Sequence, residues 1–309
     1  MSKKLQSMPV FDRMYPGANY KIPSKSGLND FQVSAQFFRN LADFKRFKLD
    51  DDLRIPTPGD ELWNVAKIFG HLRLPYPKVW IEWTNRRKDN LDSDDVTPWP
   101  MAALCIQKSE HTKFMLEMFG ARIQDSMKPH LENTTSIGMF DNSWAIYLFE
   151  MTTGTPRLIP GVLLVHLDDN GMFQGVDGRG LLGKSPEDVT MTLVDLGWDA
   201  LAAIGLLNCR NVTTKSHDRA KNLKKRRRPN RDKAATLDFA TIELPGSNES
   251  SSSPGARTDT MARHMARGHF KTFTEDAPLF GKYTGTYWWG WQLRGNRKNG
   301  EVISDYRVA

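Results

Sequence analysis

The segment SPEDVTMTLVDLGWDALAAIGLLN, residues 185–208, carries the clearest structural pattern in the chain. Ser185 is a favoured N-cap residue, Pro186 follows at the first helical position, and Glu187 and Asp188 place negative charge in the first turn. Leucine, valine and isoleucine then recur at helical spacing up to about residue 208. The segment is therefore predicted to be a long helix, 186–208, whose apolar face makes it the central buried helix of the fold.

The sequence before this helix mostly predicts strands. Runs rich in β-branched and aromatic residues are separated by turn signals, of which Asp169-Asn-Gly171 is one. An antiparallel meander with a helical segment near 111–128 is the most economical interpretation. Apolar residues also recur at helical spacing in 31–47, and 60–70 has the acidic start and terminal glycine of a helix. The predicted strands are 78–84, 101–107, 137–152 and 159–167.

These patterns predict an α+β fold, with a mostly antiparallel sheet crossed by the 186–208 helix and a smaller basic α+β region at the C-terminus. The predicted divisions are an extended arm (1–30), an α+β core domain (31–212), a basic linker (213–235) and the C-terminal region (236–309). Within this last region the predicted elements are a strand at 236–244, a short helix at 259–267, an aromatic strand at 285–293 and a strand near 301–308.

Bulk composition excludes several classes of protein. Apolar residues make up 39% of the 309, which is enough for a packed core, and two cysteines build neither a disulfide framework nor a four-thiolate zinc site. The first ten residues lack the apolar stretch of a signal peptide, and the apolar-rich segments 161–167 and 200–207 are too short to span a bilayer. We expect a cytoplasmic protein with no membrane partner, no metal and no cofactor.

Positive charge is concentrated in the C-terminal third. Residues 215–309 contain 19 Lys and Arg against 10 Asp and Glu, whereas the preceding 214 residues contain 24 against 26. The net charge of +7 therefore originates in this third. A concentrated positive field beside aromatic side chains attracts a polyphosphate chain, because each neutralised phosphate releases condensed counterions. Nucleic acid, either DNA or RNA, is the leading predicted partner.

The densest basic cluster is Lys221-Asn-Leu-Lys-Lys-Arg-Arg-Arg-Pro-Asn-Arg231. It has three interpretations: a solvated linker, a contact that holds phosphates without distinguishing bases, and a nuclear-import signal in a eukaryotic host. A second cluster with neighbouring aromatic residues follows in the same third, which favours the phosphate contact. The predicted nucleic-acid-binding residues are Lys221, Lys224, Lys225, Arg226, Arg227, Arg228, Arg231, Arg263, Arg267, Lys271, Trp289, Trp291 and Arg294.

The second cluster also has a catalytic interpretation. His264 and His269 with Arg267 between them contain the groups that metal-free phosphodiester cleavage needs: a general base, a general acid and a charge stabiliser. If Gly268 ends the predicted 259–267 helix, the two imidazoles converge. The same side chains equally suit phosphate binding without a reaction. In the simplest structural interpretation, Trp288 and Trp289 alternate across a strand, one in the core and one at the surface.

Residues Gly178-Arg-Gly-Leu-Leu-Gly-Lys-Ser185 match the phosphate-loop pattern G-x-x-x-x-G-K-[ST]. The nearest predicted strand ends eleven residues before Gly178, and proline follows Ser185 directly, where phosphate loops are already within a helix. No later strand supplies an aspartate for a metal. We therefore favour a glycine-rich connection in which Ser185 acts only as a helix cap.

Several motifs taken in order resemble the C-terminal signature of an uncharacterised family encoded by tailed bacteriophages and prophages. They are His264-x-x-Arg267-Gly268-His269-Phe270, Leu279-Phe-Gly281, Gly285-x-Tyr287-Trp288-Trp289 and Arg294-Gly295. The resemblance implies a phage gene product in the cytoplasm of a bacterial host, which weakens the nuclear-import interpretation, and it implies no activity. Leu293 stands where the family signature has a histidine, which makes a histidine-dependent reaction there less favoured.

The leading hypothesis from the sequence is a phage-encoded nucleic-acid-binding protein that contacts backbone phosphates through its basic third, with Trp289 or Trp291 stacking on unpaired bases. One alternative is an enzyme, a metal-independent nuclease that uses His264, Arg267 and His269. A second alternative is an interaction protein whose basic field docks on an acidic surface of a host or defence protein.

Overall fold

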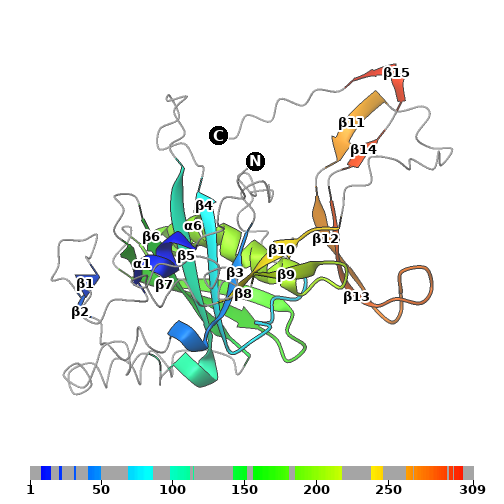
Figure 1. The fold of residues 1–309 in the computed structure, drawn as a ribbon. Coiled ribbons are helices and arrows are strands. Elements are labelled where there is room, and N and C mark those ends of the chain that lie inside the picture. The colour runs from blue at the N-terminus through cyan, green and yellow to red at the C-terminus, as the bar shows by residue number, and fades with distance from the viewer. Residues whose placement is uncertain are drawn as a thin grey trace.

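The structure is a computed structural model. It describes residues 8–14, 21–22, 31–32, 41–49, 69–85, 98–111, 114, 142–151, 156–180, 185–217, 238–245, 262–266, 268–290, 292–294 and 296–301. The described residues form an α+β fold dominated by one sheet, in the order β8-β7-β6-β5-β4-β3-β10-β9 (Figure 1). Its strands are β3 (Lys45–Lys48), β4 (Lys78–Asn85), β5 (Trp99–Gln107), β6 (Trp144–Glu150), β7 (Arg157–Leu167), β8 (Phe173–Gly180), β9 (Thr213–His217) and β10 (Phe239–Glu243).

The predicted antiparallel meander is confirmed. Each strand from β4 to β8 pairs antiparallel with the next, and the turn at 169–171 joins β7 to β8. The central strands β5 and β6 are almost continuously apolar because both faces of the sheet are covered there, and β6 is buried along its whole length. β3 departs from the meander pattern, since it pairs parallel with both β4 and β10.

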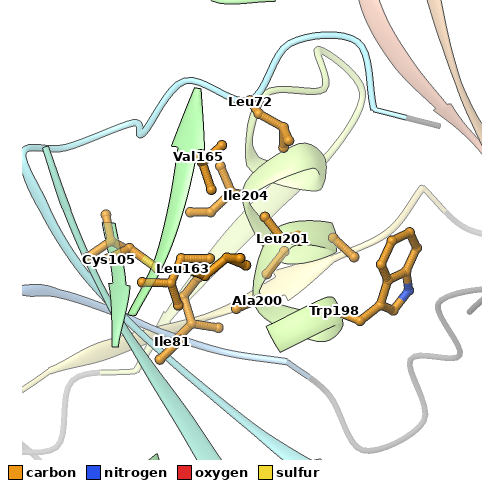
Figure 2. Close-up of a cluster of buried hydrophobic side chains, with 14 of the residues drawn as sticks. Leu72, Ile81, Cys105, Leu163, Val165, Trp198, Ala200, Leu201 and Ile204 are labelled. Atoms are coloured by element: carbon orange, nitrogen blue, oxygen red, sulfur yellow. The ribbon is translucent and has the colours of Figure 1, made fainter. Parts of the chain in front are cut away.

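Helix α6 (Pro186–Leu207) lies across one face of the sheet, as the 185–208 segment predicts. Leu201 and Ile204 on the helix pack towards Ile81, Leu163 and other sheet residues (Figure 2). By length and hydropathy α6 is apolar enough to cross a membrane, but 67% of its most apolar window is buried within the protein. This burial is the pattern of a core helix.

The Ser185 hydroxyl caps α6, because its Oγ accepts a hydrogen bond from the Asp188 backbone N–H at 3.1 Å. Replacement of Ser185 with alanine leaves that donor without its partner, and we expect the free energy of unfolding to fall by about 1 kcal/mol. Urea denaturation measures this change. Ser185→Asp retains an acceptor and should stay close to the wild type, as should the exposed control Ser216→Ala. Equal losses in Ser185→Ala and Ser185→Asp would contradict the capping role.

The opposite face of the sheet is covered by the N-terminal segment. Helix α1 (Pro9–Met14) follows Met8, and Met8, Val10, Phe11 and Met14 are all fully buried against that face. All four of these residues belong, with Trp80 of β4, to a second apolar cluster. The sheet is therefore enclosed on both sides, by α6 on one and by residues from the start of the chain on the other.

Two N-terminal predictions are corrected. Residues 1–30 were expected to form an extended arm, yet their described part includes α1, because the apolar residues of Met8–Met14 find an uncovered sheet face. The helical spacing in 31–47 was misleading, since the end of that stretch forms the short 3-10 helix η1 (Leu41–Asp43) and β3. Pairing with β4 and β10 outweighs that local periodicity. The helix expected at 60–70 and most of that expected at 111–128 lie outside the described residues.

The structure also corrects the boundaries around the phosphate-loop pattern and the basic linker. Gly178–Gly180 end β8, a strand that the sequence analysis took for a connection. β9 lies within the predicted linker 213–235, and β10 within the predicted separate C-terminal region. Both strands belong to the main sheet, because the register of β10 joins β3 on one side to β9 on the other.

The remaining strands follow β10 along the chain. β12 (His269–Phe273) and β13 (Gly285–Trp289) form a hairpin, and β11 (Ala262–Ala266) lies between β14 (Gln292–Arg294) and β15 (Asn296–Glu301) (Figure 1). β11 replaces the helix predicted at 259–267, since its backbone pairs with two strands. The aromatic strand predicted at 285–293 corresponds to β13 and part of β14. Elsewhere, β1 (Lys21–Ile22) pairs with β2 (Phe31–Gln32).

Candidate nucleic-acid interface

The β12–β13 hairpin has one face that packs on the protein and one that points away. Its register pairs His269 with Trp289 and Phe273 with Gly285, without a shift. Side chains of a strand alternate between its two faces, so this register determines which residues share a face. Phe270, Thr272, Thr286 and Trp288 share the face that points towards α6 and the core.

The inward face is held by aromatic packing. The Trp288 side chain is 3% exposed, and its ring centroid lies 4.9 Å from that of Phe270. The Phe270 ring in turn lies 5.3 Å from Phe69 in the main core. Thr272 and Thr286 pair through their hydroxyls at 2.9 Å. The inward face of the hairpin therefore packs against the core. Trp288 lies in the core, as the predicted alternation of Trp288 and Trp289 requires.

The chain just after α6 secures the edge of β13. The Asn211 side-chain amide donates to the Trp288 carbonyl at 2.7 Å, and its Oδ1 accepts from the Trp288 N–H at 2.9 Å. The Arg210 backbone N–H donates to the Thr286 carbonyl at 2.9 Å. These bonds satisfy backbone groups that β13 otherwise presents at its free edge. The hairpin is thereby fixed to the end of α6.

The outward face combines cations with aromatic rings. The residues on it are His269, Lys271, Phe273, Tyr287 and Trp289. His269 stacks with Trp289 at a centroid distance of 6.5 Å and an interplanar angle of 17°. Lys271 Nζ lies 4.8 Å from the Phe273 ring centroid and 5.7 Å from that of Trp289. His269 and Lys271 are exposed and the three aromatic residues are half-buried.

This outward face brings together three of the predicted site residues: His269, Lys271 and Trp289. Sequence analysis missed Phe273 and Tyr287 as members of the same surface. The signal was present, because His-Phe-Lys-Thr-Phe at 269–273 alternates polar and aromatic residues, and Tyr287 stands two residues before Trp289. Without the β12–β13 register, that alternation does not show that the two strands share a surface.

β11 and β14 continue this register. Ala266 pairs with Gln292 and His269 pairs with Trp289, so the same number of residues separates these pairs on both strands. The two ladders belong to different sheets but keep the same register. His264 pairs with Arg294, five positions from His269, or about 16 Å along an extended chain. The two histidine positions do not converge at the end of a helix, contrary to the expectation for the nuclease hypothesis.

The other predicted site residues divide into two groups. Arg263, His264 and Arg294 are placed by the backbone of β11 and β14 only. The remainder lie outside the described residues: Lys221, Lys224, Lys225, Arg226, Arg227, Arg228, Arg231, Arg267 and Trp291.

Imidazole–hydroxyl pairs occur elsewhere among the described residues, and two of them involve His111 and His166. His111 Nε2 lies 2.6 Å from the Tyr147 hydroxyl, and burial lowers the pKa of His111 to about 4, so this imidazole is neutral at pH 7. His166 Nδ1 lies 3.4 Å from Ser143 Oγ. Both hydroxyls are buried, so neither pair presents a nucleophile to a nucleic-acid strand. Among the described residues, no three His, Cys, Asp or Glu side chains are arranged to hold a metal ion.

The phosphate-loop pattern borders a hollow of about 480 Å³. Asp177 and Arg179 line it and form an ion pair with one contact at 2.6 Å, so the hollow contains a carboxylate, which repels phosphate. The Ser185 hydroxyl caps α6, and Gly178 donates its N–H to Thr190 Oγ1 at 2.9 Å. Gly178 and Ser185 therefore have structural roles at the junction of β8 and α6, as the capping interpretation predicts for Ser185.

Comparisons with protein-family models, curated proteins and solved structures found no match to this chain. The resemblance to phage-encoded proteins therefore stays a prediction. The outward face of β12–β13 is the candidate site that the described residues define best.

Proposed function

We propose that this chain is a phage-encoded nucleic-acid-binding protein that acts in the bacterial cytoplasm and holds unpaired bases on the outward face of β12–β13. The observation that carries the proposal is the composition of that face. Five side chains on two paired strands point away from the core, and all of them are cationic, aromatic or imidazole. Packing against the core does not account for this set, because the core contacts of the hairpin are made by the opposite face.

An aromatic ring on a rigid strand is a stacking surface for a base, and every base offers a π-face to it. Lys271 lies beside two of these rings, so its ammonium group is placed to meet the phosphate that accompanies a stacked base. Stacking of this kind requires bases that are not enclosed in a duplex. The proposed ligand is therefore single-stranded DNA or RNA.

The charge distribution supports the same proposal. The basic excess of the chain lies in residues 215–309, the part that also contains the hairpin. We propose that the run 221–231, together with Arg263, Arg267 and Arg294, adds phosphate contacts to those of Lys271. Such contacts strengthen binding to any sequence and make it depend on salt.

Trp289→Ala is expected to weaken binding to a labelled single-stranded oligonucleotide about tenfold, because stacking on one aromatic side chain contributes about 1–3 kcal/mol per base. Lys271→Ala is expected to reduce the slope of log K against log salt by about 0.7, the effect of losing one phosphate contact to a single strand. Fluorescence anisotropy across a salt series measures both changes, and gel analysis of the same samples reports whether the strand stays intact.

Tyr76→Ala is the matched control. Tyr76 is 42% exposed and has Lys45 Nζ 5.4 Å from its ring, so it repeats the lysine–aromatic arrangement beside β3. Its loss should leave binding unchanged. Equal weakening by Tyr76→Ala and Trp289→Ala would contradict a specific site on the hairpin. Absence of wild-type binding at physiological salt would overturn the proposed function.

A further inference from the structure

The connection between β12 and β13 ends in a tight turn whose backbone is unusual. The Leu279 N–H donates to the Tyr283 carbonyl at 2.7 Å, and the Tyr283 N–H donates to the Leu279 carbonyl at 2.9 Å. Between them, Phe280 has φ of 53° and Gly281 has φ of 69°. Glycine adopts this left-handed conformation readily, but for phenylalanine it is strained.

The side chain at this strained position is 86% exposed. The turn therefore holds a large apolar ring in solvent, although the backbone there disfavours such a residue. Tyr283, on the other side of the turn, is 46% exposed and has Lys282 Nζ 5.4 Å from its ring. Strained backbone that displays a side chain without packing it is typical of a functional position.

The turn belongs to the same hairpin as the outward face. Tyr283 precedes Tyr287 by four residues and Trp289 by six, so aromatic residues recur at even spacing from the turn along β13. The lysine–aromatic pair of Lys282 and Tyr283 repeats that of Lys271 and Trp289. Because the turn belongs to the hairpin whose outward face is the proposed site, a nucleic-acid strand is the ligand considered for it rather than a protein pocket. Glu275 and Asp276 are exposed on the same connection and oppose phosphate binding around them.

We propose that Phe280 is a wedge that inserts between neighbouring bases of the single strand held by the outward face. The inference rests on the proposed function and extends it, because it names a second contact and a mode of binding. Apolar side chains inserted between bases replace base–base stacking with base–aromatic stacking. A wedge in a turn closed by two backbone hydrogen bonds keeps its orientation without support from the core.

Phe280→Asn tests the wedge. Asparagine tolerates the left-handed conformation, so this variant should fold at least as stably as the wild type. We expect its affinity for a labelled single-stranded oligonucleotide to fall roughly tenfold, the effect of losing one stacked base. In a second measurement, a photo-reactive benzoylphenylalanine at position 280 should crosslink to the oligonucleotide, whereas the same group at position 76 should not.

The outcomes separate this inference from the proposed function. Wild-type affinity in Phe280→Asn, together with weakened binding in Trp289→Ala, would overturn the wedge and leave the outward face as the site. Weakening in both variants, with a crosslink at position 280, supports the wedge. If the wild type binds no oligonucleotide, the proposed function and the wedge are both wrong.

Discussion

Glu82→Ala is expected to lower the free energy of unfolding by at least about 3 kcal/mol. The Glu82 side chain is 1% exposed, and its carboxylate accepts three N–H donors. Oε1 accepts from the Phe11 backbone at 2.6 Å and from Trp80 Nε1 at 2.9 Å, and Oε2 accepts from the Val10 backbone at 3.2 Å. Alanine leaves all three buried donors without acceptors, and each costs about 1–3 kcal/mol.

Glu82 is also expected to make the free energy of unfolding depend on pH. Burial raises the pKa of Glu82 from 4.5 to about 7, with a smaller contribution from Asp12, while the three donors act in the opposite direction. Between pH 4.5 and about pH 7, Glu82 keeps its proton in the folded state and has lost it in the unfolded chain. The stabilisation from this group is therefore complete below pH 4.5 and decreases by about 3 kcal/mol as pH rises to 7.

Urea denaturation at several pH values between 4.5 and 8 tests both the loss of stability in Glu82→Ala and the pH dependence that Glu82 causes. Glu82→Gln does not titrate, so the contribution of this group to the slope should disappear in that variant. Glu243→Ala is the control, because its exposed ion pair with Lys215, at 3.5 Å, is expected to contribute less than about 1 kcal/mol. A slope in Glu82→Gln equal to that of the wild type would assign the pH dependence to other groups.

Gly178→Val is expected to cost about 3 kcal/mol or more in stability. A Cβ at Gly178 would lie 2.5 Å from Thr190 Cα and 2.8 Å from its backbone nitrogen. These atoms belong to α6, so the clash cannot be relieved by rotation of a side chain. Either the helix or β8 must move, and overpacking of this kind destabilises a protein by about 1–3 kcal/mol or more.

The control lies on the same strand. A Cβ at Gly175 meets no atom within 4 Å, so Gly175→Val should remain within about 1 kcal/mol of the wild type. Thermal and urea unfolding of the two variants measure the difference. Similar stabilities would show that α6 and β8 do not approach closely at Gly178. A large difference would show that Gly178, the first glycine of the phosphate-loop pattern, is needed for β8 to pack closely against α6.

The sequence predicted best those elements whose signals are local and strong. The 185–208 segment has a cap, an acidic first turn and a continuous apolar face, and α6 follows it closely. The strands of the meander are long β-branched and aromatic runs. β8 was missed because Gln174-Gly-Val-Asp-Gly-Arg-Gly180 contains few strand formers, and only its pairing with β7 makes it a strand.

The candidate site was predicted in part. The outward position of His269, Lys271 and Trp289 depends on the pairing of β12 with β13. The local sequence pattern predicted a helix at 259–267, just before β12. Arg263 and Arg267 are spaced like neighbours on a helix, yet β11 is extended because partner strands lie on both its sides. The exposure of Phe280 could not be predicted from the sequence, since the left-handed backbone at this phenylalanine is imposed by the closing bonds of the turn.

The parallel pairing of β3 with β10 has a consequence for synthesis of the chain. β3 ends at Lys48, and its partner begins at Phe239, so the two strands leave the ribosome far apart in time. At about 5–20 residues per second, β3 waits about 10–40 s for β10. During this interval the nascent sheet has an unpaired edge, which is the kind of surface that recruits chaperones or neighbouring nascent chains.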